Sequence, residues 1–313
     1  MSPRVPAVDP ARLARWCEEH LGSPPAKEIF RSGHLSAVFG LRLADSRAVV
    51  VKVRPHSPRV AACVVVQRRL FESGYPCPEP LTGAAPLGDS IATAEEYAPG
   101  GTLLPSADGA ARAFAEAFAR LVTLAPRPAE APSLDPPPPW AAWNHAESGL
   151  WPRSEDPDVD LNEVAGPGWI DDTGRRARDR LRADATEPVI GHCDWLAGNL
   201  RWDGDNLLMV HDWDSLTADS EAVLVGFAAA LYSTASVEEP ATVEETRRFL
   251  AAYRDARGRE FSPDELERSW AAGVWTRSYD AKCQQTAGQP ITSLSESEAR
   301  ERLGRAGAGS RRP

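Results

Sequence analysis

A short polar segment carries the side chains that could transfer a phosphoryl group. Residues 189–214 read VIGHCDWLAGNLRWDGDNLLMVHDWD and contain His192, Asp194, Asn199 and Asp212. A carboxylate such as that of Asp194 can orient an acceptor hydroxyl and take its proton. The carboxylate of Asp212 and the amide of Asn199 are oxygen ligands of the kind that Mg²⁺ prefers. The segment therefore predicts phosphoryl transfer from a nucleotide, with Asp194 as the base and Asn199 and Asp212 as metal ligands.

The spacing of these residues is that of a known motif. The order HxDxxxxN, followed by an aspartate thirteen residues later, is typical of protein-kinase-like phosphotransferases. The segment resembles the Brenner motif of the aminoglycoside phosphotransferase family, and the resemblance covers residues 27–230 in order. It implies an α+β, bilobal protein-kinase-like fold with a small β-rich N-lobe and a larger, mainly helical C-lobe. We expect the N-lobe at 1–98, the C-lobe at 99–303 and a flexible tail at 304–313.

The resemblance also implies a nucleotide site that takes ATP, or GTP in its place, together with Mg²⁺. Val49-Val50-Val51-Lys52-Val53 resembles the strand whose lysine meets the α- and β-phosphates, and residues 95–101 resemble the hinge that holds adenine. His192 belongs to the catalytic set as a brace of the loop. The remaining expected nucleotide contacts are Ser32, Gly33 and Ser36 of a phosphate loop, Gln67, and Glu96, Tyr97 and Ala98 of the hinge.

Lys52 supports this assignment on physical grounds alone. The chain has only three lysines, and this one stands among four valines. A lone ammonium is costly to bury unless an anion compensates its charge. The alternative is an edge-strand lysine whose ammonium reaches water.

The chain departs from the family pattern at several positions. Cys193 replaces the usual glycine between histidine and aspartate, and Cys63 stands where the N-lobe helix should supply a glutamate to the lysine. Gln67 lies one turn later and could accept a hydrogen bond from Lys52, but without a compensating charge. Asp214 is either a further metal ligand or the cap of the next turn. The absent glutamate and a phosphate loop with one glycine favour the alternative of a pseudokinase scaffold.

A zinc hydrolase is a third, weaker interpretation. It would use His192, Cys193, His211 and Asp212, but these residues lack the usual short zinc spacings.

Composition excludes several other classes of protein. The formal net charge of −10 disfavours a nucleic-acid binder. No apolar run approaches the roughly 18–20 residues of a membrane helix, and no signal-peptide segment is present at the N-terminus. The five cysteines are scattered without a CxxC pair, which indicates reduced thiols and a cytoplasmic protein. We therefore expect neither nucleic-acid nor membrane partners, and the sequence does not define the oligomeric state.

The acceptor is expected to be a small molecule with a hydroxyl group. Nine of the ten tryptophans follow residue 139, where the family builds its substrate side. An aminoglycoside, nucleoside or basic peptide antibiotic fits aromatic and acidic side chains, and its phosphorylation would give resistance. A choline-, homoserine- or sugar-like metabolite is the alternative. The expected substrate contacts are Trp195, Trp151, Asp156, Asp158, Trp270 and Trp275, and Trp140 and Trp143 are further candidates.

The pattern of apolar residues and prolines predicts the elements that position these groups, together with an N-cap at Asp9 and a capping box of Ser262 and Glu265. Helices are expected at 10–21, 58–73, 108–124, 169–184, 222–232, 241–257 and 262–280, with three strands in 27–54 and another at 91–97.

Overall fold

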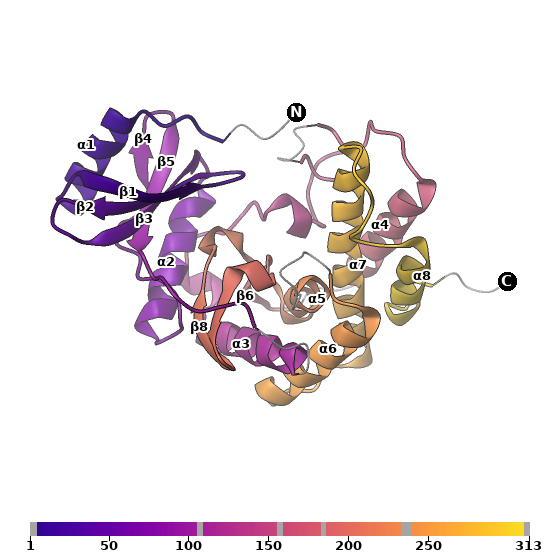
Figure 1. The fold of residues 1–313 in the computed structure, drawn as a ribbon. Helices are drawn as coiled ribbons and strands as arrows, with labels where there is room; N and C mark the ends of the chain where they lie inside the picture. Colours follow the sequence, from indigo (N-terminus) through magenta and orange to yellow (C-terminus); the bar gives the residue numbers. More distant parts are fainter. Residues whose placement is uncertain (1–4, 105–108, 155–158, 183–185, 233–239, 310–313) are drawn as a thin grey trace.

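The first third of the chain folds around a five-stranded antiparallel sheet. The computed structural model describes residues 5–104, 109–154, 159–182, 186–232 and 240–309. The strands follow the order β1-β2-β3-β5-β4, and Figure 1 shows the sheet at one end of the molecule. Their bounds are β1 (Pro25–Ser32), β2 (Ala37–Leu43), β3 (Ala48–Pro55), β4 (Ala85–Leu87) and β5 (Ser90–Glu96).

Two helices accompany this sheet. Helix α1 (Pro10–Leu21) begins after Asp9, whose carboxylate accepts a hydrogen bond from the N–H of Ala11, and a proline occupies its first turn. Helix α2 (Arg59–Glu72) follows β3 and ends before Gly74. Both helices, the three strands of residues 27–54 and the strand at 91–97 were predicted from the sequence, and the structure confirms them.

The rest of the chain is mainly helical, with two small β-units. Its helices are α3 (Ala110–Leu124), α4 (Gly168–Leu181), α5 (Glu221–Leu231), α6 (Val243–Arg257), α7 (Pro263–Thr286) and α8 (Glu296–Arg305). Strand β6 (Pro188–His192) pairs with β9 (Leu216–Ser220), and β7 (Leu200–Asp203) pairs with β8 (Asn206–Val210). Short 3-10 turns lie at η1 (Pro128–Glu130), η2 (Pro139–Ala141), η3 (Ala197–Asn199) and η4 (Trp213–Ser215).

Helices α5 and α7 pack closely at the centre of this helical part. Every residue of α5 is buried, as expected for a helix that is apolar on all sides. A Cβ on Gly226 of α5 would lie 2.1 Å from the backbone oxygen of Ser269 in α7. Glycine at this position therefore permits the contact between the two backbones.

The molecule contains two separate hydrophobic cores. The smaller core joins α1 to the sheet and includes Trp16, Phe39 and Val51. The larger core fills the helical part and also takes the buried face of α2, including Val66 and Leu70. Helix α2 thus packs with the C-lobe, although it precedes the boundary expected at residue 98.

The chain crosses between the lobes immediately after β5. The backbone N–H of Thr102 donates to the carbonyl of Trp202 in β7 at 2.9 Å, and the reverse bond measures 2.8 Å. The crossing therefore lies between Glu96 and Thr102, which supports our proposed boundary at 98/99.

Helix α8 was not predicted, and it shortens the expected flexible tail. Gly304 and Arg305 belong to this helix and Ala306 is buried, so residues 304–306 are ordered parts of the C-lobe. Residues 310–313 lie outside the described part. In the described residues, no helix is long and apolar enough to cross a membrane.

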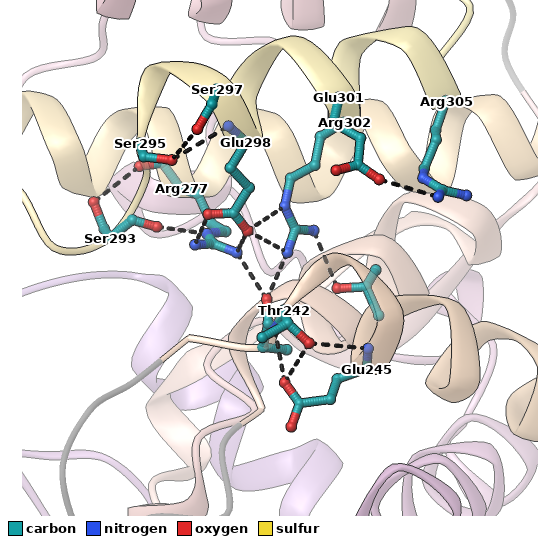
Figure 2. Close-up of polar contacts among 12 residues, drawn as sticks. Thr242, Glu245, Arg277, Ser293, Ser295, Ser297, Glu298, Glu301, Arg302 and Arg305 are labelled. Carbon is teal, nitrogen blue, oxygen red and sulfur yellow. Dashed lines mark hydrogen bonds and ion pairs between the residues drawn. The ribbon is translucent and has the colours of Figure 1, made fainter.

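A buried ion-pair network attaches α8 to α7 and α6. Figure 2 shows Glu298 between the guanidinium groups of Arg277 and Arg302, which it contacts at 2.8 Å each. Both arginines also donate to the carbonyl of Ala241, and Arg302 donates to the hydroxyl of Thr246. Burial, followed by the charge of Arg277, lowers the pKa of Arg302 to about 10. One carboxylate thus compensates two buried cations.

Candidate active site

The loop between β6 and β7 holds Asp194 and Asn199 against each other. The amide nitrogen of Asn199 donates to the Asp194 carboxylate at 3.0 Å and to the Asp194 carbonyl at 2.9 Å. The turn η3 forms this geometry, since the backbone N–H of Asn199 donates to the carbonyl of Leu196. Because its nitrogen is engaged with Asp194, the amide oxygen of Asn199 is the group it can offer to a metal ion.

His192 connects this loop to residues 211–215, which follow β8 and are called the metal segment below because they include the expected ligand Asp212. Its Nδ1 accepts a hydrogen bond from the backbone N–H of Asp194 at 3.2 Å, so in the neutral ring Nε2 carries the proton. Nε2 then donates to the carbonyls of Asp212 at 3.0 Å and His211 at 3.2 Å. The ring is fully buried, and burial lowers the pKa of His192. These contacts fit the expected role of His192 as a brace of the loop, and its burial keeps it away from a substrate.

Asp212 occupies an unusual backbone conformation directly after β8. Its φ of 62° and ψ of 51° lie in the left-handed region, which aspartate tolerates better than most residues. Its carboxylate accepts a hydrogen bond from the hydroxyl of Ser215 at 3.2 Å, and its side chain is 41% exposed. An exposed carboxylate with this orientation can bind a hard cation.

Lys52 lies between two carboxylates. Its ammonium is 3.6 Å from Oε1 of Glu95 and 3.8 Å from Oδ1 of Asp212. Burial lowers the pKa of Lys52, but the charges of Glu95, Asp214 and Asp212 outweigh it and raise the pKa. The expected alternative, an ammonium that reaches water at a sheet edge, is wrong because β3 is a central strand and Lys52 is buried.

Glu95 supplies the carboxylate that the N-lobe helix lacks. It comes from β5, the strand beside β3, and not from α2, where Cys63 is buried. The amide of Gln67 in α2 donates to Glu95 and to the carbonyl of Pro78, at 3.0 Å each. The expected hydrogen bond between Lys52 and Gln67 is therefore replaced by an indirect contact through Glu95.

Strand register explains this pairing. Lys52 faces Thr93 and Val50 faces Glu95, so Glu95 is the diagonal neighbour of Lys52 on the same face of the sheet. The sequence places Glu95 near the hinge, but only the register between β3 and β5 reveals its contact with the lysine.

Asp214 is engaged with the N-lobe. Its carboxylate forms an ion pair with Arg54 of β3, and its backbone carbonyl accepts from Arg59 of α2 at 2.5 Å. Burial raises the pKa of Asp214, but the charges of Arg54 and Lys52 outweigh it and lower the pKa. The carboxylate neither caps the next turn nor lies free beside Asp212.

The expected phosphate loop is the turn between β1 and β2. Ser32 ends β1 and is exposed, and Ser36 is half-buried. Gly33 has a φ of 139°, and a Cβ there would lie 1.8 Å from the carbonyl oxygen of Ser36. The tight turn thus requires glycine at residue 33.

Within the expected hinge, some backbone N–H groups are already hydrogen-bonded and others can bind a base. The N–H of Glu96 donates to Glu79 and that of Tyr97 donates to Ala48. Pro99 has no N–H to offer. Among residues 96–99, the N–H of Ala98 is thus the donor that the described backbone hydrogen bonds leave for a base.

Most of the tryptophans expected to contact the substrate are core residues. The side chains of Trp151, Trp195, Trp270 and Trp275 are buried, so their assignment as substrate contacts was wrong. Trp195 donates to the carbonyl of Phe114, and Trp151 packs against Trp275. Large aromatic side chains stabilise a helical core by their burial, and sequence alone does not separate this role from binding. Asp156 and Asp158 lie outside the described residues.

Trp140 contacts the catalytic loop instead, and Trp143 contacts strand β9. The indole N–H of Trp140 donates at 3.1 Å to the carbonyl of Cys193, the residue before Asp194. That of Trp143 donates at 2.7 Å to the carboxylate of Asp219, whose pKa is raised by burial. Both rings are half-buried, and they come from the segment that includes η2.

The zinc interpretation finds no support in the structure. Over the described ranges, no three histidine, cysteine, aspartate or glutamate side chains gather as metal ligands. Cys193 is fully buried, its thiol donates to the carbonyl of Ser215 at 3.0 Å, and burial raises its pKa.

Comparisons with known proteins agree with this geometry. The sequence model of the phosphotransferase enzyme family APH matches residues 28–269. No curated protein matches the chain by sequence.

Solved structures resemble the whole fold. Amicoumacin kinase hAmiN, in complex with AMP-PNP, Ca²⁺ and Ami, shares 13% identity with a TM-score of 0.59 and covers 95% of this chain and 93% of its own. A thermostable mutant of the aminoglycoside phosphotransferase APH(4)-Ia, with AMP-PNP and hygromycin B, shares 16% identity with a TM-score of 0.56 over 94% and 96%. A choline/ethanolamine kinase family protein from Mesorhizobium loti shares 17% identity with a TM-score of 0.51 over 96% and 92%.

Proposed function

Because the chain belongs to the APH family of phosphotransferase enzymes, we propose that it transfers the γ-phosphate of ATP, or of GTP, to an antibiotic or related natural product. It is a small-molecule phosphotransferase with a hydroxyl group as acceptor, and its fold is protein-kinase-like. The nucleotide, the metal ion and the class of acceptor are the parts that we propose.

The observation that carries the proposal is the arrangement of Asp194, Asn199, Asp212 and Lys52. Asp194 orients the acceptor hydroxyl and takes its proton as the oxygen attacks the γ-phosphorus. Asn199 holds the carboxylate of Asp194 in place at 3.0 Å, and Lys52 neutralises phosphate oxygens. Asn199 and Asp212 together would hold Mg²⁺, which offsets the charge of the triphosphate when bound.

The nucleotide lies between the sheet and the C-lobe in this proposal. The turn at Gly33 exposes backbone groups to the phosphates, with Ser32 and Ser36 at its two ends. The N–H of Ala98 donates to the base, while Glu96 and Tyr97 contribute their carbonyls and side chains.

An antibiotic acceptor is favoured by two observations. Trp140 places a half-buried aromatic ring beside the catalytic loop, where it can stack on a sugar or nucleoside ring, and Trp143 lies three residues further along the chain. In addition, the named ligands of two similar structures are Ami and hygromycin B. Phosphorylation of such a compound would give the host resistance.

A metabolic kinase is the second candidate, and the similar fold of the choline/ethanolamine kinase family protein favours it. The pseudokinase alternative loses its main argument, because Glu95 supplies the counter-charge whose absence from α2 favoured it. All five cysteines are free thiols, which supports the cytoplasm as the place of the reaction.

A turnover assay tests the proposal. ADP or GDP release is measured with Mg-ATP and Mg-GTP against aminoglycosides, nucleoside antibiotics, basic peptide antibiotics and small metabolic alcohols. We expect acceptor-dependent release that falls at least about 100-fold in Asp194→Ala, and stays unchanged in Asp205→Ala, an exposed aspartate of the β7–β8 turn. Release with metabolic alcohols alone would select the second candidate. Equal activity of Asp194→Ala and the wild type would refute the assignment of the base.

A further inference from the structure

Arg54 is a buried cation that the proposed reaction does not use. It follows Lys52 by two residues on β3, so the two side chains lie on the same face of the sheet. The side chain of Arg54 is 9% exposed, and one terminal nitrogen pairs with the carboxylate of Asp214. Its Nε and second terminal nitrogen are buried without a hydrogen-bond partner among the described residues. A buried guanidinium in this state depends on its one carboxylate partner.

Asp214 is held by the N-lobe at both its side chain and its backbone. Arg54 pairs with the carboxylate, while Arg59 and the thiol of Cys63 donate to its carbonyl at 2.5 and 3.8 Å. Arg59 also donates to the carbonyls of Leu134 and Leu216. These contacts come from β3 and α2, and neither element belongs to the catalytic loop.

Asp212 and Asp214 therefore differ in their exposure and in their contacts with cations. Asp212 has a side chain that is 41% exposed, and its nearest cation is 3.8 Å away. Asp214 has a less exposed side chain and is in direct contact with a guanidinium. A cation beside the Asp214 carboxylate would be repelled by the positive charge of Arg54 at contact distance.

From this contrast we propose that Arg54 is a positioning residue that withholds Asp214 from the metal site, so that Asp212 and Asn199 are its only side-chain ligands. The inference rests on the proposed use of Mg²⁺-nucleotide at this site. It predicts that the carboxylate of Asp214 contributes nothing to metal binding while Arg54 is present, and that it can hold a further divalent cation when Arg54 is replaced by a neutral side chain.

Mn²⁺ binding gives a readout that does not depend on activity. The full chain is saturated with AMP-PNP and titrated with Mn²⁺, and the ions bound per protein are counted by electron paramagnetic resonance. We expect the same count for the wild type, Asp214→Asn and the conservative variant Arg54→Lys. Arg54→Met should bind one additional ion, and the neutral double variant Arg54→Met/Asp214→Asn should return to the wild-type count.

The double variant also guards against misfolding, because it removes both charges and leaves no buried carboxylate without a partner. A loss of one bound ion in Asp214→Asn relative to the wild type would overturn the proposal. So would an unchanged count in Arg54→Met. Wild-type protein that binds neither AMP-PNP nor GMP-PNP would instead refute the proposed function, and nucleotide binding is measured separately beforehand.

Discussion

Lys52 and Glu95 form an ion pair of 3.6 Å between two adjacent strands of one sheet. The lysine thus receives its partner carboxylate from β5, whereas the sequence pattern assigns that role to the helix α2. The amide of Gln67 in α2 donates a hydrogen bond of 3.0 Å to Glu95, so α2 contributes to the ion pair only through Glu95.

Replacement of Glu95 by glutamine should weaken nucleotide binding. Without Glu95 the ammonium of Lys52 keeps Asp212 at 3.8 Å but is no longer held in position for the phosphates, so we expect the nucleotide Kd to rise about 10- to 100-fold. Glu72→Gln is the matched control, because the side chain of Glu72 is exposed at the end of α2 and belongs to none of the expected nucleotide contacts. Nucleotide Kd by isothermal titration calorimetry checks this prediction. An equal change in both variants would contradict it, as would a large loss of affinity in Cys63→Ala.

His192→Gln should lower kcat and leave the nucleotide KM nearly unchanged. Glutamine cannot accept from Asp194 and donate to Asp212 in the geometry of the imidazole, so we expect kcat to fall about 10- to 100-fold from misplacement of the base. Because burial lowers the pKa of His192, the ring stays neutral at pH 7. The kcat–pH profile of the wild type should therefore show no step that His192→Gln removes. Such a step would assign His192 a role in proton transfer.

Folding stability should fall as the pH decreases from about 6.5 to 4. Burial, with the charges of Lys52 and Arg201, lowers the pKa of His211 to about 4. The folded protein therefore binds this proton less readily than the unfolded chain, whose histidines have a pKa of about 6.5. The stabilisation by His211 is complete above its pKa in the unfolded chain, and it is lost as the pH falls through its pKa in the folded protein.

The melting temperature as a function of pH measures this effect. His211→Gln should show a shallower decline between pH 6.5 and 4 than the wild type. The remaining decline belongs to His145 and His192, whose pKa values burial also lowers. Parallel curves for variant and wild type would exclude His211 as a contributor.

Glu298→Gln should destabilise the C-lobe strongly. It leaves Arg277 and Arg302 buried without a compensating charge, and removal of one partner from such a network costs about 3–5 kcal/mol. Glu301→Gln is the control on the same helix, since its pair with Arg305 is exposed and worth at most about 1 kcal/mol. Thermal unfolding should show a fall of several degrees for the first variant and almost none for the second. Equal midpoints would show that the network is not needed for stability.

The sequence predicts local features of the fold better than long-range contacts. The cap at Asp9, the capping box of Ser262 and Glu265, and the catalytic spacing depend on neighbouring residues, and the structure confirms both caps. The partner of Lys52 depends on the register of two strands that are distant in the chain.

Burial limits the prediction of the substrate site in the same way. The sequence gives no sign that Trp151 and Trp140 differ. Trp151 is buried in the core, whereas Trp140 is half-buried and contacts Cys193, the residue before Asp194. Only the packing of α4, α7 and the segment around η2 separates them.

The division into two hydrophobic cores also predicts which elements move together. Because α2 packs into the larger core and Arg59 fastens it to the metal segment, it should move with the C-lobe as one rigid body. The other body is the sheet with α1, which carries Gly33, Lys52 and Glu95. Motion of one body against the other would then bend the chain at residues 55–58, near Pro78 and at the hinge after β5, because residues 79–82 are bonded to β5. The lysine and its carboxylate would travel together, with their ion pair intact throughout the motion.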